Sequence, residues 1–167
     1  MESFLKQHIR DVPDFPKPGI IFKDITPLLQ NHKAFDAIIK NFTDRYSSQK
    51  IDIVVGIESR GFLFGAPLAH QLGASFVPVR KKGKLPYETV DISYALEYGS
   101  ATIEMHTDAV KKGERVVVID DLLATGGTAD AACRLVKMQG GNVLECAFVV
   151  ELGFLSGRDK IKNTPVY

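Results

Sequence analysis

The chain has 167 residues, of which 45% are hydrophobic and 25% charged, an ordinary composition for a soluble globular domain with a sizeable core. Its formal net charge is only +1, so no overall positive field would recruit nucleic acid, and any basic site must be local. No apolar run reaches transmembrane length, the first ten residues lack the apolar centre of a signal peptide, and the two cysteines lack metal-ligand spacing, so we expect a cytoplasmic protein with a single domain, residues 1–167.

A short helical pattern and a proline-rich arm make up the N-terminal segment. Residues 2–10 carry apolar side chains on one side of a helix. Four residues that forbid regular structure then predict an extended, stiffened arm: Pro13, Pro16, Pro18 and Gly19. Residues 20–29 are strongly apolar, which is unusual for a loop. They either pack over an edge of the core or form a lid that buries a flat ligand.

A helix and a strand–loop–helix unit follow. Asn31 is a suitable N-cap for a helix that we interpret as core packing, and residues 51–57 predict the first buried strand. Ser59 and Arg60 come at the carboxyl end of that strand, and the guanidinium of Arg60 is suited to a diphosphate. The alternative is that Arg60 is a surface residue that pairs with Glu58.

A basic segment and a stretch of alternating residues come next. Residues 74–80 predict a second strand, which four cations end or follow: Arg80, Lys81, Lys82 and Lys84. Such a charge run is usually a solvated face, but its place after a strand also fits a mobile, anion-facing loop. Apolar and polar residues alternate over 87–99, and residues 101–105 are predicted to pair back with them. This alternation fits an exposed flap as well as a core strand.

The segment VVVIDDLLATGGT, residues 116–128, joins a strand, two carboxylates and a glycine-containing turn. Residues 115–119 are apolar and β-branched enough for a buried parallel strand. Asp120 and Asp121 come at its carboxyl end, where open α/β sheets bind ligands. The turn then leads into a helix that is predicted to run to about Gln139.

This turn has the composition of a phosphate site. Gly126 and Gly127 allow positive φ and close approach of the backbone to an anion, and Thr125 and Thr128 add hydroxyl donors. Backbone N–H groups at a helix N-terminus bind phosphate, whereas a carboxylate pair suits the vicinal hydroxyls of a sugar. Together they predict a site for a ribose 5-phosphate. The alternative is an acidic pair that only caps the following helix.

Residues 142–150 predict one more apolar strand. Strands and helices thus alternate along the chain, which predicts a doubly wound α/β domain with a mainly parallel sheet flanked by helices. The histidines are dispersed and offer neither a metal site nor a catalytic triad, so no metal held by protein side chains is expected. They are His8, His32, His70 and His106.

These segments resemble a known family. VVVIDDLLATGGT is similar to the phosphoribosyl-diphosphate (PRPP) signature of the type I phosphoribosyltransferases, and DDLLATGGT resembles the adenine phosphoribosyltransferases in particular. PDFPKPGIIFKDITPLL, GIESRGFLFG, RKKGKLP and YALEYG match further family segments, so the resemblance covers nearly the whole chain. It implies transfer of the 5-phosphoribosyl group from PRPP to N9 of adenine, giving AMP and diphosphate. It also implies Mg²⁺ bound mainly through PRPP, diphosphate and water.

The resemblance also assigns roles to residues. The 5-phosphate and ribose would be held by Asp120, Asp121, Ala124, Thr125, Gly126, Gly127 and Thr128. Diphosphate would be held by Ser59, Arg60, Arg80, Lys81 and Lys84. Adenine would be held by Ile21, Phe22, Lys23 and Leu122. Glu97 would act on the purine N7 proton, Tyr98 would close the site, and Arg60 would stabilise the leaving diphosphate.

The resemblance implies that the arm, residues 1–30, forms part of a hood over the base. Phe22 would stack on the purine, the Ile21 carbonyl would accept from the 6-amino group, and the Lys23 N–H would donate to N1. This order of acceptor and donor fits adenine and mismatches a 6-oxopurine.

Four further expectations come from the resemblance. It implies a homodimer, with residues 80–105 forming a basic loop and a flexible flap, and the basic loop near the interface. It implies a cis peptide bond between Glu58 and Ser59, with Gly61 relieving the crowding behind it. The family's chains usually continue beyond the segment that matches residues 165–167, so we expect a shortened or disordered end.

Two alternative functions stay open. A PRPP-sensing regulatory module without catalysis would share the fold, but it would need an appended DNA-binding element, and no helix-turn-helix stretch precedes this domain. A phosphoribosyltransferase for a 6-oxopurine would share the PRPP site, but the arm and the DDLLATGGT wording count against it. The expected partners are the small molecules adenine and PRPP, with no nucleic acid and no membrane.

Overall fold

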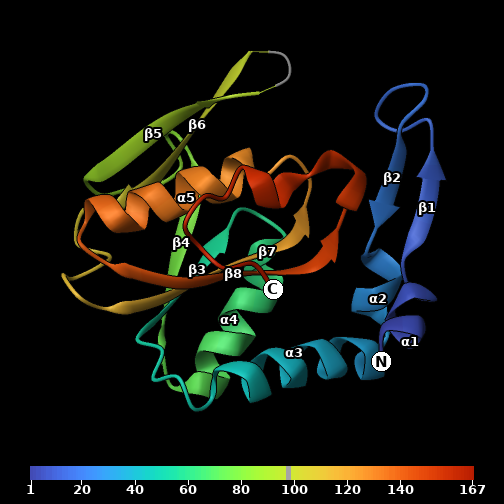
Figure 1. Cartoon of the computed structure of the whole chain (residues 1–167), viewed down its shortest axis with the longest axis horizontal. Coiled ribbons are helices and arrows are strands. Elements are labelled where there is room, and N and C mark those ends of the chain that lie inside the picture. Colours follow the sequence, from blue (N-terminus) through green and yellow to red (C-terminus); the bar gives the residue numbers. More distant parts are fainter. Residues whose placement is uncertain (97–98) are drawn as a thin grey trace. The chain divides into compact units, whose positions relative to one another are not determined.

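The computed structural model describes residues 1–96 and 99–167, which form two compact units, Met1–Arg45 and Tyr46–Tyr167. The first unit contains three helices and a two-stranded sheet (Figure 1). Its elements are α1 Glu2–Lys6, β1 Arg10–Pro13, β2 Ile21–Asp24, α2 Thr26–Gln30 and α3 His32–Tyr46. Asn31 caps α3 as predicted, because its Oδ1 accepts a hydrogen bond from Ala34 N at 3.1 Å. No helix of the described ranges is both long and apolar enough to cross a membrane.

The proline-rich arm is part of a β-hairpin. Pro16, Pro18 and Gly19 lie outside regular structure as predicted, whereas Pro13 belongs to a strand, which corrects the prediction there. β1 and β2 pair antiparallel, from Arg10 opposite Asp24 to Pro13 opposite Ile21. Pro13 is compatible with this pairing because it is the last residue of its strand, and Pro16 lies in the connection, after a cis bond to Phe15. A strand end and a hairpin connection need no ladder donor, which is why the prolines do not prevent the hairpin.

A six-stranded sheet with the order β5-β6-β4-β3-β7-β8 forms the centre of the second unit. Strands β4, β3, β7 and β8 are parallel, whereas β6 runs antiparallel to β4, and β5 antiparallel to β6. The strands are β3 Ile53–Ile57, β4 Ser75–Lys81, β5 Thr89–Ala95, β6 Ser100–His106, β7 Arg115–Leu123 and β8 Asn142–Glu151. This confirms the mainly parallel sheet, and β5–β6 is the antiparallel pair predicted within residues 87–105.

Two helices, α4 (Gly61–Leu72) and α5 (Gly127–Met138), cover opposite faces of this sheet (Figure 1). Val116 and Val118 of β7 pack into the core cluster that includes α5. Ile119 points to the other face, where a Cβ added to Gly65 of α4 would lie 2.9 Å from its Cγ2. Because α4 follows β3, α5 follows β7, and these strands are parallel neighbours, both connecting loops lie at one edge of the sheet.

Strand β7 is longer than predicted. We expected it to end at Ile119, but its pairing with β8 continues through Asp120 opposite Phe148 to Leu123 opposite Glu151. Asp120 and Asp121 are therefore strand residues, and their side chains point to opposite faces of the sheet. This alternation gives the two carboxylates different neighbours.

The end of the chain lies along β8, contrary to our expectation of disorder there. Val166 forms a parallel bridge with Cys146. The N–H of Tyr167 donates to the Cys146 carbonyl at 2.8 Å, and the N–H of Phe148 donates to the Tyr167 carbonyl at 2.9 Å. These bonds continue the sheet beyond β8 by a few residues.

The two cysteines meet in the core although 13 positions separate them. Cys133 of α5 and Cys146 of β8 are buried free thiols, and their Sγ atoms lie 3.1 Å apart. The hydrogen bond between them lowers the pKa of Cys133 and, together with burial, raises the pKa of Cys146.

Candidate active site

The predicted phosphate site is the turn between β7 and α5, residues 124–128, which we call the phosphate loop. A cavity of about 80 Å³ lies over it. The cavity is lined by Asp120, Leu122, Leu123, Ala124, Thr125, Gly126, Gly127, Thr128, Ala129 and Phe148. Gly126 adopts a φ of 82° as the N-cap of α5, whereas Gly127 is the first helical residue and does not need the positive φ that we predicted for both glycines. The helix N-terminus thus borders a small, partly polar hollow suited to an anion.

The back of the phosphate loop packs against a short 3₁₀ segment, η2 (Gly157–Asp159). A Cβ added to Gly126 would meet the carbonyl oxygen of Gly157, and a Cβ added to Gly157 would meet that of Ala124. Both positions therefore require glycine for close backbone contact. Gly157 was not recognised from the sequence, because it lies some thirty residues after the motif that it supports.

Asp120 and Asp121, near the end of β7, have different contacts because their side chains lie on opposite faces of the sheet. Asp121 is only 3% exposed, and its Oδ2 lies 2.9 Å from Nε of Arg60. Asp120 accepts a hydrogen bond at Oδ1 from the N–H of Asp121 at 2.8 Å. Burial raises the pKa of Asp120 well above its usual range, and the adjacent charge of Asp121 raises it further. Asp120 is thus a carboxylate whose charged form is disfavoured before a ligand binds.

The loop between β3 and α4, residues 58–61, approaches this pair closely; we call it the diphosphate loop. The peptide bond between Glu58 and Ser59 is cis, as predicted. A Cβ added to Gly61 would lie 2.8 Å from the carbonyl oxygen of Ile119 and 3.0 Å from Oδ1 of Asp120, so glycine is required for the approach. Arg60 is the N-cap residue of α4 and reaches Asp121 from this loop.

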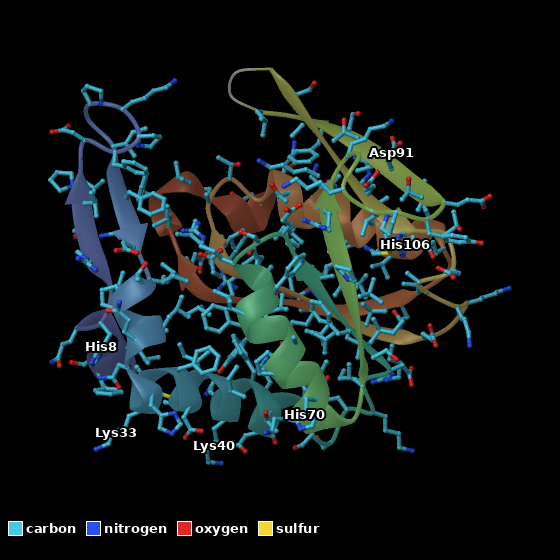
Figure 2. All side chains as sticks on the ribbon, turned by 180° about the vertical axis from the view of Figure 1, so that it is seen from behind. His8, Lys33, Lys40, His70, Asp91 and His106 are labelled. Atoms are coloured by element: carbon cyan, nitrogen blue, oxygen red, sulfur yellow. The ribbon has the colours of Figure 1, made fainter. Side chains whose placement is uncertain are left out.

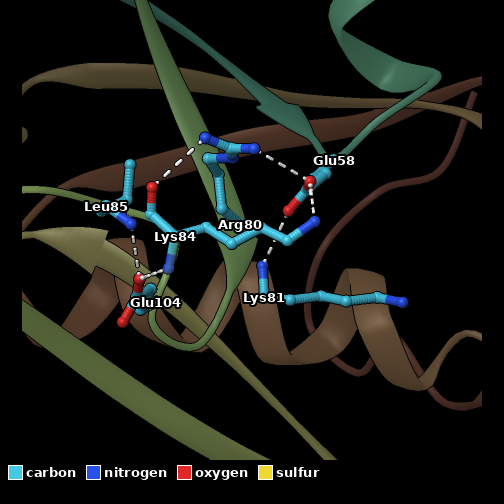
Figure 3. A network of polar contacts seen from close by, with 6 residues as sticks. All are labelled: Glu58, Arg80, Lys81, Lys84, Leu85 and Glu104. Carbon is cyan, nitrogen blue, oxygen red and sulfur yellow. Dashed lines mark hydrogen bonds and ion pairs between the residues drawn. The ribbon is translucent and has the colours of Figure 1, made fainter.

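The basic loop, residues 80–85, is anchored by Glu58 (Figure 3). Oε1 of Glu58 accepts from Nη2 of Arg80 at 3.1 Å and from Nζ of Lys84 at 2.8 Å. Oε2 accepts from the N–H of Lys81 at 3.0 Å. Burial alone would raise the pKa of Glu58, but the hydrogen bonds from Lys84, Arg80 and Lys81 outweigh it and lower the pKa to about 2. Glu58 is therefore a charged counter-ion of the basic loop. From the sequence we considered Glu58 as the ion-pair partner of Arg60, but Arg60 forms its ion pair with Asp121.

A second carboxylate, Glu104 of β6, holds the backbone of the same loop (Figure 3). Glu104 is 3% exposed, and its Oε1 accepts from the N–H groups of Lys84 at 3.0 Å and Leu85 at 2.9 Å. Burial alone would raise the pKa of Glu104, but these backbone hydrogen bonds lower it overall. Hydrogen bonds to Glu58 and Glu104 thus hold the loop in this structure, and its mobility stays a prediction.

The cations of the basic loop differ in their partners. Nζ of Lys82 forms an ion pair with Asp91 of β5 at 2.8 Å, and Arg80 and Lys84 share Glu58. The side chain of Lys81 points away from the network (Figure 3), and among the described residues its ammonium has no ion-pair partner. Within the described part of the chain, Lys81 is therefore the loop cation whose charge no ion pair already balances.

A second cavity, of about 160 Å³, brings the three loops together. It is lined by Ile57, Glu58, Val79, Arg80, Lys81, Tyr94, Ala101, Ile103, Asp120 and Thr128. It shares Asp120 and Thr128 with the cavity over the phosphate loop, so the two hollows adjoin. Glu58 and Tyr94 line this cavity, although sequence reasoning gave neither a role in ligand binding. Glu58 was considered only as a partner of Arg60, and Tyr94 only as part of the alternating pattern of residues 87–99.

Three of the four residues predicted to hold a base, Ile21, Phe22 and Lys23, lie on β2 in the first unit. Ile21 is 57% exposed, and Phe22 contacts Phe15 edge-on with ring centroids 5.2 Å apart. The N–H and C=O of one residue in an antiparallel strand point to the same side, and successive residues alternate. The carbonyl of Ile20 accepts from Phe15 N–H on the β1 side, so Ile21 C=O and Lys23 N–H face the opposite edge. That edge has no strand partner among residues 1–96 and 99–167.

Of the remaining predicted residues, some lie at the site and others lie outside the described part of the chain. Leu122 lines the first cavity, and Ser59 lies in the diphosphate loop. Glu97 and Tyr98 lie outside the described residues. His70 is in the last turn of α4 and His106 ends β6, well apart from each other (Figure 2). Within the described ranges, no three His, Cys, Asp or Glu side chains are grouped to hold a metal ion.

Comparison with known proteins agrees with this arrangement. A family model described as a phosphoribosyl transferase domain matches residues 24–165. The adenine phosphoribosyltransferase of Chloroflexus aurantiacus is 58% identical over 159 residues, which cover 95% of this chain and 92% of that protein. The crystal structure of the adenine phosphoribosyltransferase from Rhodothermus marinus has a TM-score of 0.94 at 55% identity and covers 99% of this chain and 94% of that chain.

A third relative was solved with ligands. The adenine phosphoribosyltransferase of Saccharomyces cerevisiae, complexed with adenine and D-2,5-dideoxy-2,5-imino-altritol 1,6-bisphosphate, has a TM-score of 0.93 at 45% identity. The match covers 99% of this chain and 96% of that chain. The chain therefore belongs to the phosphoribosyltransferase family, among the adenine phosphoribosyltransferases.

Proposed function

We propose that this chain transfers the 5-phosphoribosyl group of PRPP to N9 of adenine, forming AMP and releasing diphosphate. The observation that carries the proposal is the convergence of three loops on two adjoining cavities. A helix N-terminus faces one cavity, Asp120 lines both, and the cations Arg80 and Lys81 line the other. That order matches the phosphate, ribose hydroxyls and diphosphate of one PRPP molecule.

Binding of PRPP is divided among the loops. The phosphate loop, residues 124–128, holds the 5-phosphate through N–H groups and hydroxyls. Asp120 and Asp121 accept hydrogen bonds from the ribose hydroxyls. Ser59, Arg60 and the basic loop hold the diphosphate, with Lys81 as the cation not already paired. The binding energy gained at the 5-phosphate, which lies away from the reacting atoms, helps to hold C1 of the ribose in position for attack.

Recognition of adenine is assigned to Ile21, Phe22, Lys23 and Leu122. The alternation of β2 supports this part of the proposal, because it gives one strand edge an acceptor at Ile21 and a donor at Lys23. An edge with that order matches the 6-amino group and N1 of adenine and mismatches a 6-oxopurine. The yeast relative was solved with adenine bound.

The chemical step requires stabilisation of charge at both ends of the breaking bond. Arg60 and the basic loop stabilise the leaving diphosphate, and the ribose passes through an oxocarbenium-like state. Glu97 takes the N7 proton of the purine, and Tyr98 closes the site. Mg²⁺, when bound, neutralises diphosphate charge. PRPP oxygens and water would supply most of its ligands, because Mg²⁺ usually keeps several waters and binds through substrate phosphates.

A panel of nucleobases tests the proposal. The chain is incubated with PRPP, Mg²⁺ and adenine, hypoxanthine, guanine or xanthine, and nucleotide formation is measured. We expect AMP to form rapidly, the 6-oxopurines to react poorly, and omission of Mg²⁺ to abolish turnover. Comparable turnover of hypoxanthine would contradict the adenine assignment and leave the PRPP site intact. PRPP binding without any nucleotide product would favour a regulatory module.

A further inference from the structure

A hydroxyl–hydroxyl contact joins the hairpin β5–β6 to the phosphate loop. Oη of Tyr94, on β5, lies 2.8 Å from Oγ1 of Thr128, in the first turn of α5. The ring of Tyr94 packs on the same turn, since a Cβ added to Gly127 would lie 3.3 Å from its Cδ2. The contact thus combines a hydrogen bond with ring packing and links residues 34 positions apart.

The contact lies where it can influence a ligand. Tyr94 and Thr128 line the 160 Å³ cavity together with Asp120, Arg80 and Lys81. Thr128 also lines the cavity over the phosphate loop, whereas Tyr94 does not. Tyr94 therefore contacts the phosphate loop at Gly127 and Thr128 without itself lining the cavity over that loop.

Either hydroxyl could donate in this contact, and the direction decides which hydrogen bonds remain for a ligand. A threonine hydroxyl has one proton to donate and can accept hydrogen bonds, and a phenolic hydroxyl can do the same. If Tyr94 donates to Oγ1, the single proton of Thr128 is directed away from Tyr94 and remains for a phosphate oxygen. Fixing that donor before the ligand arrives removes the cost of orienting it on binding.

We propose, on the basis of the proposed function, that Tyr94 is a positioning residue for the 5-phosphate. Its hydroxyl donates to Thr128 Oγ1 and fixes the Thr128 hydroxyl as a donor to the phosphate. Tyr94 acts through Thr128 and makes no contact with the reacting atoms. Its effect should therefore be larger on ligands that carry the 5-phosphate than on diphosphate alone.

A double-mutant cycle on ribose 5-phosphate binding tests this role. Tyr94→Phe keeps the ring and its packing, and Thr128→Val keeps the shape of the side chain without its hydroxyl. Dissociation constants for ribose 5-phosphate are measured by titration calorimetry for the wild-type chain, both single variants and the double variant. We expect Tyr94→Phe to weaken binding by about 2- to 10-fold, the range of one neutral hydrogen bond. In the Thr128→Val background, Tyr94→Phe should have no further effect.

Controls separate positioning from general structure. Tyr87→Phe is the matched control, because Tyr87 is 59% exposed and contacts His106 only through its ring. It should leave ribose 5-phosphate binding unchanged, and Tyr94→Phe should lose less affinity for diphosphate than for ribose 5-phosphate. For Tyr94→Phe, KM for PRPP should rise while kcat at saturating PRPP stays near the wild-type value.

Opposite results are distinguishable. Equal binding of ribose 5-phosphate by the wild-type chain and Tyr94→Phe would overturn the positioning role, as would an equal loss in the Thr128→Val background. Either result leaves the proposed function standing if the wild-type chain makes AMP. A wild-type chain that neither binds ribose 5-phosphate nor makes AMP would overturn both.

Discussion

At the scale of single residues, Asp120 and Asp121 show how neighbouring carboxylates acquire different properties. Strand alternation sends Asp121 toward Arg60, whereas Asp120 lines both cavities and has a raised pKa because of burial and the charge of Asp121. The charge of Asp120 is thus unfavourable in the free protein. Sites that prepare a charged group for a ligand commonly reduce stability in this way.

Replacing Asp120 by Asn should therefore stabilise the free protein while weakening PRPP. The folded state holds the Asp120 proton more tightly than the unfolded state, where an Asp titrates near pH 3.9. Wild-type stability should fall relative to Asp120→Asn as the pH rises above about 4 toward the folded pKa. At pH 7 we expect a Tm higher by a few degrees, at about 2–4 °C per kcal/mol, and a higher KM for PRPP.

Melting curves at several pH values, with PRPP kinetics at pH 7, check this prediction. Asp108→Asn is the control, since Asp108 is exposed and lines neither cavity. A lower Tm for Asp120→Asn at neutral pH would mean that the charge of Asp120 is favourable in the free protein.

Glu58 has the opposite character. Its pKa is lowered to about 2, so its charge stabilises the fold above the unfolded Glu pKa of about 4.3, and this contribution is lost as the pH falls through about 2. Glu58→Gln should lower the free energy of unfolding at pH 7 by roughly 1–2 kcal/mol, discounted because Arg80 and Lys84 are partly exposed. Glu58→Gln should also reduce the loss of unfolding free energy that the wild-type chain shows as the pH falls from about 4.3 to about 2.

Urea unfolding at pH 7 and pH 3 measures both effects of Glu58→Gln. Glu88→Gln provides the comparison, because Glu88 is an exposed carboxylate near the same loop. If Glu58→Gln and wild type lost equal stability on acidification, Glu58 would not be the charged counter-ion of the basic loop.

At the scale of elements, the phosphate loop depends on a partner that is remote in sequence. η2 supports it through the close contacts of Gly126 and Gly157, while α5 and β7 hold its two ends. The geometry of a turn that binds phosphate thus depends on packing behind it as well as on its own glycines. The same 3₁₀ region contains a glycine, Gly153, whose Cβ position is open.

Gly157→Ala should disturb the phosphate loop. The new Cβ would meet the carbonyl oxygen of Ala124 and lie 2.9 Å from Cδ1 of Leu123, so the backbone must shift. Overpacking of this kind costs about 1–3 kcal/mol of unfolding free energy, and we expect weaker ribose 5-phosphate binding as well. Gly153→Ala meets no atom within 4 Å and should leave both quantities near the wild-type values.

Denaturant titration measures the unfolding free energy of the two alanine variants, and calorimetry measures their binding of ribose 5-phosphate. Tight ribose 5-phosphate binding by Gly157→Ala would show that the phosphate loop can rearrange without losing its function. A large loss for Gly153→Ala would show that any change in this region affects the loop, independent of the close contact.

At the scale of the whole molecule, we predict a homodimer on the basis of family resemblance. Leu63 on α4 and Tyr87 beside the basic loop are 42% and 59% exposed, which leaves apolar surface available for such a contact. Each chain has a mass of 18.4 kDa, so sedimentation velocity at assay concentrations should give about twice that value. A fully active monomer at those concentrations would contradict the prediction. A cytoplasmic location likewise stays a prediction.

The sequence by itself determined the elements that carry the phosphate site and their order. Val116 to Thr128 could be interpreted alone because a buried strand, a helix start and a glycine with positive φ each have local causes. Neighbouring residues within one short segment set all three. The mainly parallel sheet followed from the alternation of strands and helices, and the family resemblance supplied the cis bond at Glu58–Ser59.

Only the tertiary structure decided which side chains meet. The sheet order places β3 between β4 and β7, which brings Glu58 to Arg80 and Arg60 to Asp121, partners 22 and 61 positions apart. The contact of Tyr94 with Thr128 has the same origin. Such pairings depend on which strands become neighbours and which face each residue takes. Long-range packing sets both, and no local pattern in the sequence encodes them.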